Sequence, residues 1–82
     1  MQHKGVIAQV LGPVVDVQFD EGSLPQINEE LVVEKDGERR VMEVAREIGH
    51  GAVRCILLSP GEGLGRGDEV IATGQKIGRA HV

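Results

Sequence analysis

With 82 residues, the chain has the length of one small domain, and its thirteen acidic and nine basic residues give it a formal charge of −4. That sign repels phosphate backbones, and Phe19 is the only aromatic residue, so neither charge nor base stacking supports a nucleic-acid binder. No targeting segment is predicted, and no apolar stretch approaches the length of a membrane span, so we expect no membrane insertion.

The first predicted element is a mostly apolar strand over residues 6–11, which a Gly-Pro turn ends. The next element shows the cleanest alternation of apolar and polar residues in the chain. This alternation is typical of a strand with one face in the core and the other in water. The expected core-facing residues are Val15, Val17 and Phe19. The expected water-facing residues are Asp16, Gln18 and Asp20.

A β-hairpin is predicted around Asp36-Gly37, because both positions of this two-residue turn need positive φ, which Asp and Gly tolerate. The turn follows a predicted strand over residues 30–35. It sets four pairs of residues opposite each other: Lys35 with Glu38, Glu34 with Arg39, Val32 with Val41, and Leu31 with Met42. Two complementary charge pairs at the tip and an apolar base support this register.

Residues 40–48 fit two patterns. One face of a strand would carry Met42, Val44 and Ile48. A helical stripe would carry Val41, Val44, Ala45 and Ile48, and Gly49 would end that helix. The preceding hairpin favours the strand.

Residues 52–58 are apolar on both faces apart from Arg54, which predicts a well-buried strand. A glycine-rich loop over residues 61–67 separates it from a last predicted strand over residues 68–73, and the tail 75–82 is only weakly patterned. Short strands joined by tight turns, with no long helix, predict one domain over residues 1–82, built as an antiparallel β-barrel or a compact sandwich.

No catalytic residue, cofactor or metal site is predicted. Glycine never immediately precedes lysine, so the P-loop motif is absent, and the glycine-rich loop precedes a predicted strand where a phosphate site needs a helix. His3, His50 and His81 lie far apart in the sequence, and Cys55 has no cysteine partner. We interpret Cys55 as a small core residue in a reducing compartment. We therefore expect the chain not to be an enzyme.

The structural residues that we single out form a core and one charge pair. The predicted core includes Val15, Val17, Phe19, Val44, Val53 and Cys55. Arg54 interrupts an apolar run, and a buried arginine needs a partner. Asp16 and Glu43 are the strand carboxylates best placed to reach it, and we favour a pair between Asp16 and Arg54. The alternative is that Arg54 emerges at a sheet edge.

Several motifs, in order, resemble the amino-terminal β-barrel domain of the catalytic (beta) subunit of rotary ATP synthases. They are Gly5–Phe19, with its G-P-V-V-D-V-Q-F; Leu24-Pro25-Gln26-Ile27 followed by Leu31; Met42–Gly49, with its E-V-A; Val53–Ile56; Gly63–Val70; and Thr73-Gly74. The resemblance spans about residues 5–74 and favours a strand for residues 40–48. The sequence departs from the family pattern in the tail 75–82 and in the loop 59–62.

The resemblance implies an all-β fold, a small six-stranded antiparallel closed β-barrel. It also implies a non-catalytic assembly role, in which neighbouring alpha- and beta-type barrels pack into the crown ring of the catalytic hexamer. The residues that handle ATP in that family lie beyond this domain, so none is carried over. The implied location is cytoplasmic, peripheral to the inner face of an energy-transducing membrane. The alternative is a stand-alone or redesigned barrel that self-associates, as a homo-oligomer, or binds a small ligand.

Overall fold

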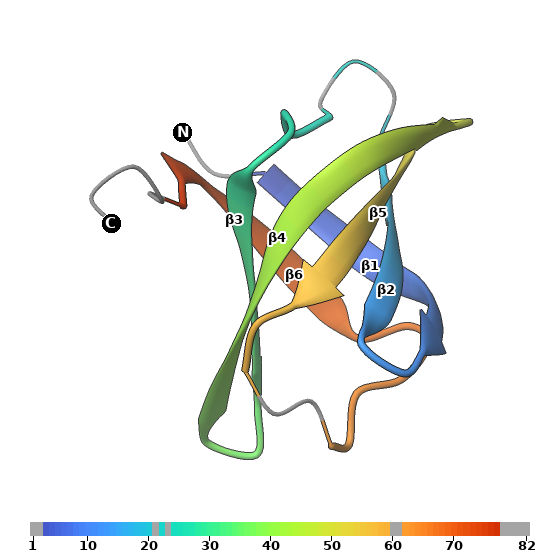
Figure 1. Ribbon diagram of the computed structural model, residues 1–82. Helices are drawn as coiled ribbons and strands as arrows, with labels where there is room; N and C mark the ends of the chain where they lie inside the picture. The colour runs from blue at the N-terminus through green and yellow to red at the C-terminus, as the bar shows by residue number, and fades with distance from the viewer. Residues whose placement is uncertain (1–2, 21, 23, 60–61, 78–82) are drawn as a thin grey trace.

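The computed structural model describes residues 3–20, 22, 24–59 and 62–77. These residues form six strands that pair antiparallel and close into a barrel in the order β1-β2-β5-β4-β3-β6 (Figure 1). The strands are β1 His3–Leu11, β2 Val14–Phe19, β3 Glu29–Lys35, β4 Glu38–Gly49, β5 Ala52–Leu57 and β6 Glu69–Lys76. The predicted six-stranded antiparallel closed β-barrel is confirmed, and residues 40–48 are strand.

The β3–β4 hairpin has the register that its turn predicts. Lys35 lies opposite Glu38, and the three pairs that follow, down to Leu31 with Met42, are also as expected. Asp36 and Gly37 have φ values of 55° and 78°, so both turn residues occupy the left-handed region. This conformation matches the right-handed twist of the flanking strands, which is why the turn determines the register.

Replacing Gly37 with Val should weaken this hairpin. A β-branched residue resists the positive φ of 78° at this position. We expect a loss of about 1–2 kcal/mol in the free energy of unfolding, measured by urea denaturation. The matched control is Gly37→Asn, because asparagine tolerates the left-handed region and should lose clearly less. Equal stability of the two variants would contradict the role of the turn.

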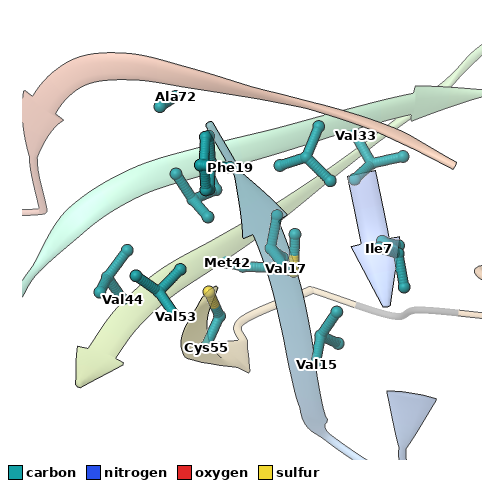
Figure 2. Close-up of a cluster of buried hydrophobic side chains, with 12 residues drawn as sticks. Ile7, Val15, Val17, Phe19, Val33, Met42, Val44, Val53, Cys55 and Ala72 are labelled. Carbon is teal, nitrogen blue, oxygen red and sulfur yellow. The ribbon is translucent and has the colours of Figure 1, made fainter. Parts of the chain in front are cut away.

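The barrel interior is filled by one cluster of twelve buried side chains (Figure 2). All six residues expected in the core belong to it, and Val17, Val53 and Cys55 are fully buried. The remaining members are Ile7, Leu31, Val33, Met42, Val70 and Ala72. Phe19, the only aromatic residue, lies opposite Gly5, which has no side chain to oppose the ring.

The expectation that residues 52–58 form a strand buried on both faces is wrong. The inward residues Val53 and Cys55 are fully buried, but Ile56 and Leu58 point outward and are 39% and 51% exposed. Both edges of β5 are paired, one with β2 and the other with β4. Its inner face contributes Val53 and Cys55 to the core. A single closed sheet has no second layer to cover the outer face. The outer apolar residues of β5 are therefore on the molecular surface.

Two strands extend further than the sequence pattern suggested. β1 begins at His3, which pairs with Ala72 of β6, and β6 continues to Lys76, which pairs with Glu29 of β3. These ends have little hydrophobic alternation, so backbone pairing with neighbours extends them. Residues 78–82, including His81, lie outside the described residues.

Candidate assembly surface

Asp16 and Arg54 lie directly opposite each other on the outer face of β2 and β5. Arg54 Nε donates to Asp16 Oδ1 at 2.8 Å, and Arg54 Nη2 donates to Asp16 Oδ2 at 3.0 Å. Gln9 Nε2, on β1, adds a longer contact to Asp16 Oδ2 at 3.4 Å. Such a bidentate pair fixes both side chains across the strands. Arg54 does not emerge at a sheet edge, since β5 has a neighbour on each side.

The expectation that Asp16 belongs to a solvated face is wrong. Its side chain is on the outer face, as the alternation predicted, but the residue is only 7% exposed. Arg54 and Gln9 cover it and satisfy its oxygens. Glu43, the alternative partner for Arg54, instead accepts a hydrogen bond from Asn28 Nδ2. Sequence periodicity reports the face of a strand, but it does not report which neighbours cover that face.

The pair changes the acidity of both groups. The hydrogen bonds from Arg54 hold the pKa of Asp16 below its ordinary value, burial opposes them, and the positive charge of Arg54 adds to the lowering. The same hydrogen bonds raise the pKa of Arg54. A carboxyl group whose pKa is lower in the folded than in the unfolded state stabilises the fold above its unfolded pKa. That contribution is lost as the pH falls through the folded pKa.

We expect Asp16→Asn to lower the melting temperature by a few degrees at neutral pH. The difference from the unsubstituted chain should shrink as the pH falls from about 5 and should vanish below the folded pKa of Asp16, because protonation then removes the same charge. Thermal melts between about pH 7 and pH 2 measure this. Asp20→Asn, at an exposed carboxylate just after the same strand, is the control and should leave the profile unchanged. A pH-independent effect of Asp16→Asn would contradict the assignment.

The basic groups beside the glycine-rich loop hold the loop itself. Lys35 Nζ donates to the carbonyl of Gly63 and, at 3.0 Å, to Asp68 Oδ2. Arg40 is buried and donates to the carbonyl of Glu62 at 2.7 Å. Asp68 also accepts from the backbone N–H of Gly65, which, with Lys35, lowers the pKa of Asp68. This loop and the β3–β4 hairpin lie at the same end of the barrel (Figure 1).

The hydrogen bonds of Lys35 and Arg40 to the loop before β6 are here called the clasp, and their role is structural. The sequence analysis did not predict them. Strand β6 follows the loop, so the described residues offer no helix N-terminus to a phosphate there. Arg40 lies opposite the buried Val33, so it faces the barrel interior near its end. The predicted hairpin register already contained that pairing. It was the only signal that could have revealed Arg40 as an inward-facing cation.

Among the described residues, the remaining candidate groups do not gather into a reactive site. Cys55 is buried in the core, and this burial, with a smaller contribution from Asp16, raises the pKa of its thiol to about 12. Within residues 3–20, 22, 24–59 and 62–77, no cluster of three or more His, Cys, Asp or Glu side chains could hold a metal ion. Over the same ranges, none of the secondary structure is a helix that could cross a bilayer.

One outer surface of the barrel, here called the β4–β5 surface, exposes apolar side chains. It is a depression of about 570 Å³ whose apolar lining includes Ile27, Ala45, Ile56 and Leu58. The apolar character continues across the sheet, because Ile56 pairs with Val14, which pairs with Leu11. Leu11 is 62% exposed. Contiguous apolar patches on a protein surface are typical of sites that contact other proteins.

A second outer depression, here called the β3–β6 surface, has a volume of about 540 Å³. Val32 and Ile71, which pair directly across the two strands, form its apolar floor. The rest of its lining is polar and consists of Glu34, Arg39, Glu69 and Thr73. The two depressions have no lining residue in common. The barrel therefore has two outer depressions of different character on different strands.

The sequence model of the β-barrel domain of the ATP synthase alpha/beta family matches residues 7–74. The match runs from the buried Ile7 of β1 to Gly74 of β6, so it covers parts of all six strands. It agrees with the closed barrel and with the resemblance seen in the sequence motifs. The chain belongs to the ATP synthase alpha/beta family, as its amino-terminal β-barrel domain.

Proposed function

We propose that the chain is the non-catalytic assembly barrel of a beta-type ATP synthase subunit, which holds its subunit beside neighbouring alpha- and beta-type barrels in a ring. The support for the beta type is the ordered motif set, above all G-P-V-V-D-V-Q-F at the β1–β2 turn. The location would be cytoplasmic, next to the inner face of an energy-transducing membrane. This placement rests on the family resemblance alone.

The observation that carries the assembly role is the contrast between the interior and the outer wall. Apolar side chains fill the interior, while Leu11, Ile27 and Leu58 are each more than half exposed on the outside. Burying apolar area stabilises association by roughly 25 cal/mol per Å² before the cost of lost freedom is subtracted. The chain thus has a driving force for contact with other proteins.

Sedimentation velocity with the barrel domain of an ATP synthase alpha subunit tests this function. We expect an equimolar mixture to sediment faster than either chain alone, because the outer surfaces find the contacts that they have in the ring. A chain that associates with neither alpha-type nor beta-type barrels would overturn the proposal. Calorimetric titration with Mg-ATP is the second arm, and saturable binding to the isolated chain would also overturn it.

A further inference from the structure

The clasp binds a segment that makes few other contacts with the barrel. Residues 62–66 of the loop before β6, here called the strap, lie at the same end of the barrel as the β3–β4 hairpin (Figure 1). Among the described residues, no backbone hydrogen bond joins the strap to a strand. The first such bond follows the strap, where Gly67 N–H donates to the carbonyl of Ile7 at 2.8 Å. Within the strap, the half-buried Leu64 packs against the core cluster.

Arg40 would keep hydrogen bonds if the strap moved away. Its Nη2 donates to the carbonyl of Glu62, in the strap, at 2.7 Å. Nη2 also donates to Glu38 Oε1, and Nη1 donates to the carbonyl of Lys35, both at 3.2 Å. These two acceptors belong to the β3–β4 hairpin. Opening of the strap would therefore not leave a buried cation without acceptors, which is the costly situation.

Lys35 has the opposite arrangement, because both of its side-chain acceptors lie in or just after the strap. Its Nζ donates to the carbonyl of Gly63 and, at 3.0 Å, to Asp68 Oδ2. The side chains of Lys35 and Asp68 are 34% and 22% exposed, so water can solvate both charges when they separate. Ion pairs that water reaches are individually weak. The bonds of Lys35 are thus the part of the clasp that opening removes at low cost.

We infer that the strap opens and closes while the barrel stays folded, and that Lys35 keeps it closed. The fixed end is Gly67-Asp68, where backbone hydrogen bonds join the chain to β1. Segments with few apolar contacts and few backbone hydrogen bonds are the ones that open locally in folded proteins. The motion involves a single chain, so it goes beyond the proposed assembly function and does not depend on it.

Opening changes the surface at this end of the barrel. Leu64 leaves the core cluster for solvent, and the Lys35 ammonium loses its acceptors. A protein that contacts this end then shifts the strap toward whichever state it binds more tightly. The balance between the two states also depends on ionic strength, because salt screens the attraction between partly exposed charges.

A protease that cleaves after glutamate tests the opening, because the carbonyl of Glu62 is the group that it must attack. In the closed strap this carbonyl accepts from Arg40, and that of Gly63 accepts from Lys35. The Glu62–Gly63 bond is therefore cleaved from the open form, and at low protease concentration the cleavage rate follows the population of that form. Glu43, buried in β4, reports unfolding of the barrel. Mass spectrometry measures the two cleavages separately, and we expect the one after Glu62 to be much the faster.

Lys35→Met should accelerate cleavage after Glu62 about 10-fold, because methionine keeps an unbranched apolar side chain but cannot donate a hydrogen bond. The matched control is Lys4→Met, which makes the same change at an exposed lysine whose pair with Glu69 spans 3.8 Å. This control should leave the rate within about 2-fold of the unsubstituted chain. Circular dichroism checks that both variants fold, and Lys35→Gln replaces Lys35→Met if the latter does not.

Ionic strength gives a second measurement, which needs no variant. Raising NaCl from about 0.05 M to about 1 M should accelerate cleavage after Glu62 in the unsubstituted chain, because it screens the pair of Lys35 and Asp68. A short glutamate-containing peptide, cleaved under the same conditions, corrects for the effect of salt on the protease.

Three results would overturn the inference. Equal rates of cleavage after Glu62 and Glu43 would mean that the strap opens only when the barrel unfolds. Resistance of Glu62 to a protease that cuts the urea-unfolded chain there would mean that the strap does not open. A rate that neither the Lys35 variant nor salt changes would mean that Lys35 does not keep it closed.

Discussion

Val17→Asp is expected to leave the chain unfolded at 25 °C. Val17 is fully buried within the barrel cluster, where its neighbours are apolar side chains (Figure 2). An unpaired carboxylate in such a place costs several kcal/mol, even after it takes up a proton. A chain of 82 residues has a total stability of only about 4–12 kcal/mol. Circular dichroism and a thermal melt measure the result, which should show no cooperative transition.

The matched control is Val6→Asp, the same substitution on the outward face of β1. Val6 is 45% exposed and pairs with Gln18 and Glu69 across its neighbouring strands. A carboxylate there remains in water, so we expect a change within about 1 kcal/mol. A folded Val17→Asp, or two variants of equal stability, would show that the inward and outward faces are wrongly assigned.

The inward face of the barrel could be predicted from the sequence because its signals are local. Alternation placed Val15, Val17 and Phe19 on one side of β2, and a strand has no other way to bury all three together. The Asp36-Gly37 turn determined the β3–β4 register residue by residue. Both signals act over a few residues, so they do not depend on the rest of the fold.

What the sequence could not predict depends on contacts between distant segments. The Gly12-Pro13 turn sets Leu11 opposite Val14, and a regular ladder from there would place Phe19 opposite Val6. An irregularity between Ile7 and Gln9 shifts the register by one residue, so that Phe19 meets Gly5. The alternation of apolar and polar residues in this part of the sequence does not indicate the β-bulge. A bulge changes which face and which partner every later residue has.

The candidate surface was harder to predict than the core, and for a related reason. The apolar residues Ile56 and Leu58 were visible in the sequence but were interpreted as core, since periodicity cannot distinguish a second buried face from an exposed contact surface. The ion pair of Asp16 and Arg54 was proposed from chemical need, and the structure places the two side chains together. The clasp made by Lys35, Arg40 and the loop before β6 involves segments more than twenty residues apart.

The closed barrel separates backbone pairing, which is complete within the sheet, from the side chains exposed on its outer wall. Closure pairs the backbone of neighbouring strands, which protects a Val- and Ile-rich sheet from edge-to-edge association. In the proposed assembly role, contact with other proteins is left to side chains on the outer wall. This separation of interior stability from exterior contact is what the proposed assembly role requires.

Gly5→Ala is expected to destabilise the barrel by about 1–3 kcal/mol, although it adds a single methyl group. The new Cβ would lie 2.7 Å from the carbonyl oxygen of Gln18 and 3.0 Å from two ring carbons of Phe19. The oxygen belongs to the backbone of a paired strand, so it cannot rotate away as a side chain would. For a domain of this size, that loss lowers the melting temperature by about 4–8 °C for each kcal/mol.

Gly65→Ala adds the same methyl group where no atom lies within 4 Å and should change stability by no more than about 0.5 kcal/mol. If Gly5→Ala melted at the temperature of Gly65→Ala, then Phe19 would not pack against Gly5 as the register requires.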